Sequence, residues 1–74
     1  MDMMNLSDIE KRILMKSPCS ENSFGDLPKT EVRSAIVRLR DFGLVNAPEV
    51  EKEGFFLVTL KTKGKAYLKE YLNA

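Results

Sequence analysis

A helical stripe of apolar residues between positions 30 and 43 is the clearest pattern in the chain. Apolar side chains recur there at intervals of three and four, the spacing that places them on one face of an α-helix: Val32, Ala35, Ile36, Leu39 and Phe42. Thr30 is expected to cap the N-terminus, with Glu31 near the positive end of the helix dipole. Gly43 is expected to end the helix in a left-handed conformation, with Leu44 folding back on Leu39. The pattern therefore predicts a capped helix with one face in the core.

Another helix is predicted before it. Ser7 and Glu10 have the spacing of a capping box, in which each side chain accepts a hydrogen bond from the other residue's backbone. Pro18 is expected to end this helix near Lys16, because a proline disfavours helical conformation in the residue before it. The apolar side is expected to consist of Leu6, Ile9, Ile13 and Leu14. The charged side chains of Lys11, Arg12 and Lys16 are expected to face water.

Residues 19–29 leave two alternatives open. In the first, Ser20 caps a helix of about six residues that ends before Leu27. In the second, Ser23 and Phe24 form a short strand that leads into a single turn around Asp26. Both alternatives predict a tight corner at residues 27–29.

The pattern changes from helical to extended after Gly43. Residues 44–45 open a strand, residues 46–48 interrupt it, and residues 49–51 alternate as an edge strand would. Residues 52–54 form a turn, and residues 55–60 return as the strongest strand in the chain. Alternation would place Phe55, Leu57 and Thr59 on one face of that strand and Phe56, Val58 and Leu60 on the other. The sequence thus predicts a β-hairpin directly after the capped helix.

A final amphipathic helix is predicted from Thr62, as N-cap, to Leu72. Its apolar stripe comprises Gly64, Tyr67, Leu68, Tyr71 and Leu72. Gly64 would allow close approach to a neighbouring backbone, although glycine costs about 1 kcal/mol in helix propensity relative to alanine. Four lysines against one glutamate make residues 61–74 locally basic.

The composition fits one small domain over residues 1–74, with residues 1–5 expected to fray. Apolar residues make up 43% of the chain and charged residues 31%, which is ordinary for a folded domain. The formal net charge is only +1, so a nucleic-acid partner would have to be recognised through local charge. The sequence shows neither a membrane-length apolar run nor a signal peptide, which predicts an unprocessed, soluble, cytoplasmic protein.

Residues that usually carry enzyme chemistry are few. Histidine is absent, and with it the commonest metal ligand and general base. Cys19 is the one cysteine, and we interpret it as a small, partly buried structural residue rather than a nucleophile. The sequence also lacks a phosphate-cradling glycine loop and a paired-carboxylate constellation. We therefore expect no enzyme activity, no cofactor and no metal site.

The order of the predicted elements resembles the winged helix-turn-helix superfamily. Residues 39–45, Leu-Arg-Asp-Phe-Gly-Leu-Val, resemble the junction between recognition helix and wing. Residues 60–68, Leu-Lys-Thr-Lys-Gly-Lys-Ala-Tyr-Leu, resemble the Leu-Thr-x-x-Gly-x-x-x-Leu segment after the wing in bacterial and archaeal regulators of the multiple-antibiotic-resistance type. The similarity covers about residues 6–72. It implies an α+β fold with a three-helix core, a two- or three-stranded β-hairpin wing and a final helix after the wing.

This resemblance implies a sequence-specific transcriptional regulator that binds double-stranded DNA, expected as a homodimer. The helix over residues 30–42 would lie in the major groove, with Arg33 or Arg38 pairing with guanine and Val37 touching a thymine methyl. Lys52 at the wing tip, and Lys61 and Lys63 at the final helix, would contact phosphates. The residues expected to face DNA from the recognition helix are Lys29, Thr30, Arg33, Ser34, Val37 and Arg38. The two arginines are expected to dominate DNA affinity.

The charges of the predicted wing support an alternative. Three glutamates against Lys52 make residues 44–54 locally acidic, and DNA phosphates would repel such a segment: Glu49, Glu51 and Glu53. On the recognition helix, Glu31 and Asp41 partly neutralise the arginines. The alternative is a winged-helix module that binds another protein through the acidic wing and an exposed Val37.

Overall fold

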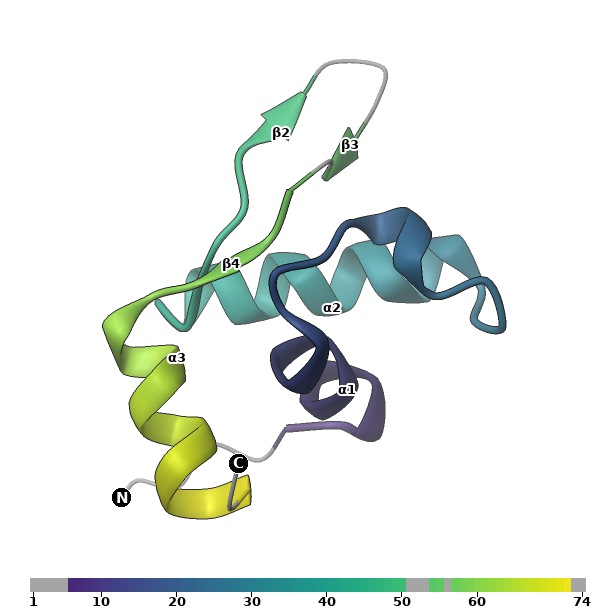
Figure 1. The fold of residues 1–74 in the computed structure, drawn as a ribbon. Coiled ribbons are helices and arrows are strands. Elements are labelled where there is room, and N and C mark those ends of the chain that lie inside the picture. The colour runs from purple at the N-terminus through teal and green to yellow at the C-terminus, as the bar shows by residue number, and fades with distance from the viewer. Residues whose placement is uncertain (1–5, 51–53, 56, 73–74) are drawn as a thin grey trace.

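The computed structural model describes residues 6–50, 54–55 and 57–72, and this part of the chain has an α+β fold (Figure 1). Its helical elements are α1 (Asp8–Lys16), the 3₁₀ turn η1 (Glu21–Ser23), α2 (Lys29–Asp41), α3 (Thr62–Tyr67) and the π-helical turn η2 (Leu68–Leu72). Its strands are β1 (Val45–Asn46), β2 (Glu49–Val50), β3 (Gly54–Phe55) and β4 (Thr59–Leu60). The expected fraying of residues 1–5 concerns positions outside the described residues.

Helix α1 begins with the predicted capping box. The Ser7 N–H donates to Oε1 of Glu10 at 2.8 Å, and the Glu10 N–H donates to Oγ of Ser7 at 3.2 Å. The helix ends at Lys16, as expected from Pro18. Its apolar side packs into the core, with Leu6, Ile13 and Leu14 buried and Ile9 partly buried.

The segment after α1 combines the Ser20 cap of the first alternative with the turn around Asp26 of the second, where the Leu27 N–H donates to the Phe24 carbonyl at 3.1 Å. Ser20 does act as a cap, because its Oγ accepts from the Asn22 N–H at 3.1 Å. The helical turn that it caps is only three residues long, so the six-residue helix was wrong in length and the strand at residues 23–24 was wrong. The chain leaves the helical path at Phe24, whose buried side chain joins the core.

Helix α2 begins one residue earlier than predicted, at Lys29. The expectation that Thr30 is the N-cap was wrong, because Pro28 holds that position with an extended backbone and its carbonyl accepts from the N–H groups of Glu31 and Val32. The C-terminus matches the expectation. Gly43 has a φ of +78°, and the Leu44 N–H donates to the Leu39 carbonyl at 3.0 Å, as in a Schellman end.

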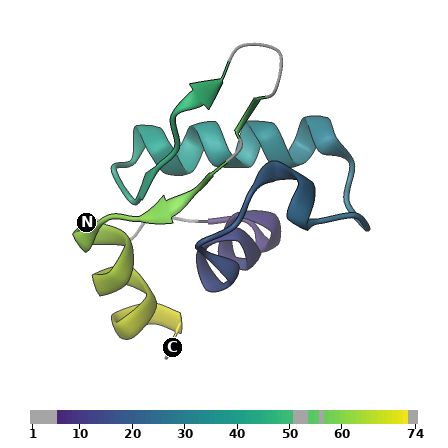
Figure 2. The same cartoon turned by 45° about the horizontal axis from the view of Figure 1, so that its top comes forward.

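The short strands form two antiparallel pairs. Strand β1 pairs with β4, and β2 pairs with β3 to form the hairpin that stands over α2 (Figures 1 and 2). Pro48 cannot donate to a ladder and lies where the pairing breaks. Cys19 forms a single antiparallel bridge with Val58, on the side of this segment that faces away from β1. The chain near Val58 and β4 therefore lies between Cys19 and β1.

The alternation predicted for residues 55–60 was wrong. Phe55 and Val58 are both buried, although they were assigned to opposite faces, and Leu57 is 52% exposed. The cause is the break between β3 and β4, since a period of two holds only within an uninterrupted strand. Phe56 lies outside the described residues.

Helix α3 confirms the predicted close approach at Gly64. A Cβ atom built on Gly64 would overlap the carbonyl oxygen of Leu44 and lie 3.2 Å from Cδ2 of Leu60. The helix begins at Thr62 with Lys61 as its N-cap, so the prediction of Thr62 as cap was wrong by one residue. Gly64, Tyr67 and Leu68 are buried as the stripe predicts.

Helix α2 occupies the middle of this arrangement. It packs against α1 on one side and against the hairpin on the other, as two views of the ribbon agree (Figures 1 and 2). Its core face is formed by Val32, Ala35, Ile36 and Leu39, with Phe42 partly buried beside them. The remaining face of α2 is open to solvent between these two neighbours.

Candidate nucleic-acid interface

The outer face of α2 is a narrow exposed strip, and we use this name for its exposed residues Lys29, Thr30, Glu31, Arg33, Ser34, Arg38 and Asp41. A shallow groove runs on each side of it. One lies between α2 and the start of α1 and is lined in part by Ile9 and Arg38. The other lies between α2 and the hairpin and is lined in part by Glu49 and Phe55. Ser34 lines both grooves, so it stands on the ridge between them.

Arg38 marks the α1 side of the outer face. Its Nε lies 2.9 Å from Oε2 of Glu10, a carboxylate that is 2% exposed, while the Arg38 side chain is 56% exposed. Glu10 thus serves two elements, since its other oxygen closes the capping box of α1. The guanidinium also lies over the Phe42 ring, 5.3 Å from its centroid. The ion pair with Glu10 fixes the Nε end of the Arg38 guanidinium, and the rest of the group is exposed to solvent.

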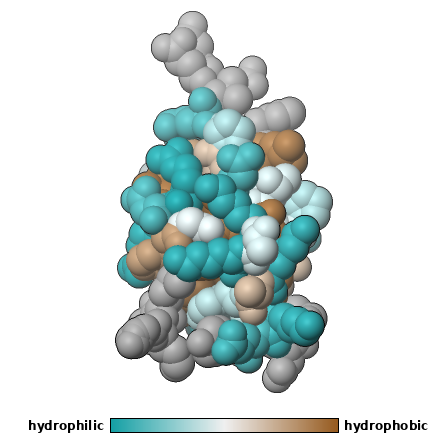
Figure 3. Space-filling model, turned by 90° about the vertical axis from the view of Figure 1, so that its left-hand side faces the viewer, coloured by the Kyte–Doolittle hydropathy of each residue, from teal (hydrophilic) through white to brown (hydrophobic). Residues whose placement is uncertain are grey.

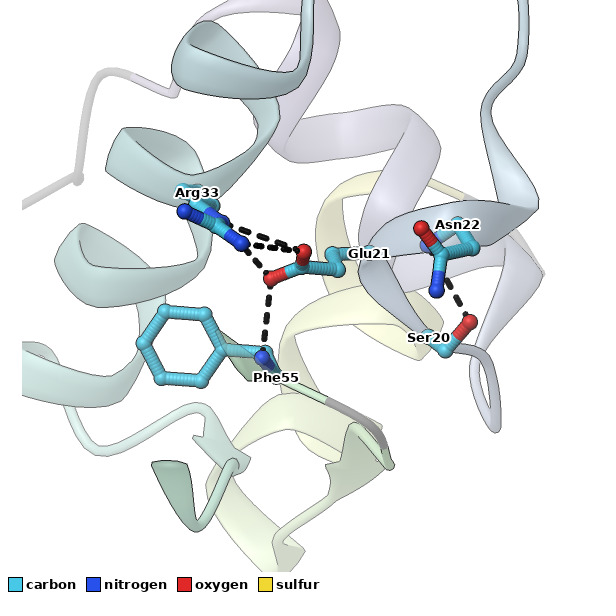
Figure 4. Close-up of polar contacts among 5 residues, drawn as sticks. All are labelled: Ser20, Glu21, Asn22, Arg33 and Phe55. Atoms are coloured by element: carbon cyan, nitrogen blue, oxygen red, sulfur yellow. Dashed lines mark hydrogen bonds and ion pairs between the residues drawn. The ribbon is translucent and has the colours of Figure 1, made fainter. Parts of the chain in front are cut away.

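Arg33 marks the hairpin side. Its Nε donates to both oxygens of Glu21, at 2.9 and 3.0 Å, and its Nη2 donates to Oε2 at 2.8 Å (Figure 4). Glu21 is 2% exposed, whereas the Arg33 side chain is 47% exposed. The two predicted guanine-reading residues are therefore each tied to a buried glutamate from another helical element.

These pairings make the outer face nearly neutral. The cationic side chains of α2 are balanced by Glu31 and Asp41 on the helix and by Glu10 and Glu21 beneath it. Arg40 does not add to the outer face, because its Nη1 lies 3.4 Å from the Ala47 carbonyl oxygen and its guanidinium lies over the Phe55 ring. Long-range attraction of phosphates by this face is accordingly weak.

The predicted phosphate-contacting lysines lie elsewhere. Lys63 donates from Nζ to the Phe42 carbonyl at 3.0 Å, at the C-terminal end of α2, and Lys61 is the N-cap of α3. The face of the molecule that carries α3 is mainly hydrophilic (Figure 3). Lys29 is at the other end of α2, roughly 20 Å away along a helix of 13 residues. These lysines and the two arginines do not form one continuous basic face.

The remaining residues that the sequence assigned to a DNA or protein contact are Val37 on α2 and the charged residues of the hairpin. Val37, expected to be exposed, is half-buried and packs against the core, because it lies on the side of α2 nearest the hairpin. Glu49, at the start of β2, is exposed. Lys52, Glu51 and Glu53 lie outside the described residues.

Sequence reasoning missed the roles of Glu10 and Glu21. Glu10 was assigned only to its capping box, and Glu21 carried no signal, since it is an acid in the first turn of a short helical segment. Their arginine partners lie on α2 and meet them only after the chain has folded. Counting charges along the sequence therefore treats both glutamates and both arginines as solvent-exposed.

The Glu21 carboxyl titrates unusually. The hydrogen bonds from Arg33 hold the pKa of Glu21 below its ordinary value of 4.5, and burial only partly offsets them. The same contact raises the pKa of Arg33, so the guanidinium stays charged. A depressed folded-state pKa means that the ionised group stabilises the fold above the unfolded pKa.

We predict that this stability is lost as pH falls from about 4.5 through the lower folded-state pKa of Glu21. Urea unfolding followed by far-UV circular dichroism at a series of pH values measures it. Asp26, whose pKa is also lowered by its hydrogen bonds from Arg12, contributes in the same range and is removed with Asp26→Asn. In the Asp26→Asn background, Glu21→Gln should reduce the remaining fall in the free energy of unfolding at acidic pH. An unchanged fall would contradict the assignment to Glu21.

Other chemistry is sparse in the described part of the chain. Cys19 is buried, and burial raises the pKa of its thiol, which fits the structural interpretation. The described residues contain no group of three or more potential metal-ligating side chains. Within the same residues, every helix is too short or too polar to cross a bilayer.

Comparison of the chain with protein-family models, curated proteins and solved structures finds no significant match.

Proposed function

We propose that the chain is a winged-helix DNA-binding protein that places α2 in the major groove and regulates transcription in the cytoplasm. The observation that carries the proposal is the outer face of α2, where the small hydroxyl side chains of Thr30 and Ser34 lie between two half-exposed arginines. Each arginine is held by a buried glutamate, which reduces the entropy lost when it contacts a base.

The arrangement of elements supports this proposal. Two α-helices separated by the 3₁₀ turn η1, a hairpin beside α2 and a helix after the hairpin follow the order of a winged helix. The bridge between Cys19 and Val58 adds a third extended segment beside the strands, which fits the two- or three-stranded wing that the resemblance implies. The second helix is reduced to η1, so α2 is held by the pairing between Glu21 and Arg33 as well as by packing.

The chemistry of the outer face favours base contacts over phosphate contacts. Guanidinium groups match the paired acceptors O6 and N7 of guanine, and serine and threonine hydroxyls can bond bases or phosphates. Lys29 and Lys61 are exposed and available for phosphates at opposite ends of α2. Because the face is nearly neutral, non-specific binding should be weak. A homodimer would add affinity by addressing two half-sites.

Selection of duplexes from a randomised pool, followed by titration at several salt concentrations, tests the proposal. The wild type should bind selected duplexes, with a log-log salt slope of about −0.9 for each phosphate neutralised. Ser34→Glu places an acid on the exposed ridge between the two arginines, where it repels phosphates and lies one helical turn from Arg38. It should weaken binding by about tenfold or more, as loss of a good base contact does.

Lys65→Gln is the matched control. It changes the net charge by the same amount as Ser34→Glu, at an exposed position of α3 away from the outer face. Its affinity should stay within about twofold of the wild type, since it removes no contact and alters only the screened field. Equal losses in both variants, or no duplex binding by the wild type at low salt, would overturn the proposal.

A second candidate is a protein-binding winged helix, favoured by the neutralised outer face and the exposed Glu49. It requires that the wild type not bind duplexes and that charge reversal at Glu49 disrupt a purified protein complex. Arg33→Lys should leave that complex intact, because the partner surface is the hairpin rather than α2.

A further inference from the structure

Glu21 joins three elements at one carboxylate. It belongs to η1, accepts the Arg33 guanidinium of α2, and accepts the Phe55 N–H of β3 at 2.8 Å (Figure 4). Gly54 makes room for it, because a Cβ atom there would overlap Oε1 of Glu21 and lie 2.8 Å from its carboxyl carbon. Gly54 also has a φ of +73°, which a residue with a side chain rarely adopts. The hairpin backbone is thus shaped around this carboxylate.

The pairing uses one particular edge of the Arg33 guanidinium. Nε and Nη2 share the side edge, and both donate to Glu21. The end edge, formed by Nη1 and the outer hydrogen of Nη2, makes no hydrogen bond to the residues that the structure describes. Arg12 shows the opposite choice, since its Nη1 and Nη2 donate end-on to Asp26. Arg33 can therefore keep Glu21 and still offer two parallel donors.

Arg33 is also prevented from turning away. Release from Glu21 would leave a buried carboxylate with only the Phe55 amide as donor, which is costly for an ionised group. The guanidinium is fixed in orientation before any ligand arrives. Two parallel donors in a fixed plane match the paired O6 and N7 acceptors of guanine.

We infer that Glu21 is a specificity-determining positioning residue: by holding Arg33 side-on, it directs the end edge of that guanidinium to a guanine. The inference rests on the proposed function. Through Phe55 the same carboxylate fixes the hairpin relative to the base-reading arginine, so α2 and the hairpin meet DNA as one unit.

The test compares Glu21→Gln with Glu49→Gln. Glutamine is similar in size to glutamate but has only one acceptor oxygen. In either orientation its NH₂ group would face an N–H donor of Arg33 or Phe55, so at least one of these hydrogen bonds is lost. Glu49→Gln is the matched control, because it removes the same charge from a residue that lines the hairpin groove beside Arg33 but makes no hydrogen bond to it. Each protein is titrated with a selected duplex and with the same duplex carrying 7-deazaguanine, which lacks N7, at each guanine in turn.

The wild type and Glu49→Gln should each lose about tenfold in affinity at one guanine when N7 is removed. Glu21→Gln should lose less than about twofold there, because its Arg33 is no longer oriented, while its affinity for random duplexes should rise with the loss of a negative charge. The measured quantity is the ratio of affinities for the duplex with and without N7, taken on one protein preparation. A lower folded fraction affects both affinities equally and cancels from this ratio.

Four outcomes would overturn the inference. If the wild type binds no duplex, the proposed function fails as well. If the wild type binds but Glu21→Gln keeps its full N7 dependence, or no guanine shows such dependence, Glu21 does not set specificity and the proposed function stands. If Glu49→Gln loses N7 dependence equally, charge rather than orientation is responsible.

Discussion

Replacing Gly64 with alanine is expected to lower the free energy of unfolding by at least about 2 kcal/mol, despite the better helix propensity of alanine. The added Cβ atom would overlap the Leu44 carbonyl oxygen and lie 3.1 Å from the carbonyl carbon. That oxygen cannot move aside freely, because it accepts from the Lys61 N–H at 3.0 Å. Helix α3 must therefore shift away from Leu44 and the start of β1.

Gly25→Ala is the matched control. No atom lies within 4 Å of a Cβ built on Gly25, so the same chemical change meets open space. Its stability should change little, because alanine there only restricts the unfolded chain. Thermal unfolding by far-UV circular dichroism suits a chain without tryptophan, and about 2 kcal/mol should lower the midpoint by roughly 10 °C. Equal midpoints for the two variants would contradict the close approach.

Replacing Glu21 with alanine should cost about 2 kcal/mol of folding free energy, the price of leaving the buried Phe55 N–H without an acceptor. The truncation also removes the acceptor of Arg33 and leaves a space beside Gly54. Urea unfolding at pH 7 measures the change. The hairpin should loosen first, so backbone amides of β2 and β3 should exchange with solvent faster than those of α1.

Asp26→Ala provides the comparison for Glu21→Ala. Asp26 also pairs with an arginine, through bonds of 3.0 and 3.3 Å from Arg12, but both side chains are largely exposed. An exposed pair contributes little because water replaces the lost contacts. Its removal should leave the unfolding midpoint almost unchanged. A loss as large as that of Glu21→Ala would show that burial is not what makes the Glu21 pairing important.

The proposed role of the two arginines differs from the sequence-based expectation in its physical basis. The sequence-based expectation was that Arg33 and Arg38 pair with guanine and dominate DNA affinity, on a helix whose charge Glu31 and Asp41 neutralise only in part. In the structure Glu10 and Glu21 neutralise much of that charge and fix the orientation of Arg38 and Arg33. Affinity from general electrostatics should then be small and discrimination between bases comparatively large, which is why Ser34→Glu and 7-deazaguanine are more informative tests than net charge.

Features that depend on neighbouring residues followed from the sequence alone. The capping box at Ser7, the left-handed glycine at residue 43 and the core stripe of α2 are set by interactions within a few residues. The N-caps were misplaced, by two residues at Thr30 and by one at Thr62, because extended backbone at Pro28 and Lys61 provides the N-cap without a side-chain bond. The need for glycine at residue 64 was also readable, since a glycine on an apolar stripe signals close packing.

Only the tertiary structure decided which charges are solvated. Glu21 and Arg33 are 12 residues apart, and nothing in the intervening pattern states that η1 packs on α2 or that the Phe55 amide joins them. The break between β3 and β4 likewise depends on which strands pair, and it placed Phe55 and Val58 in the core together. The sequence by itself determined the elements and their apolar faces, because these follow from local geometry. Burial of a carboxylate and the orientation of its arginine arise only when separate elements pack, and packing decided them here.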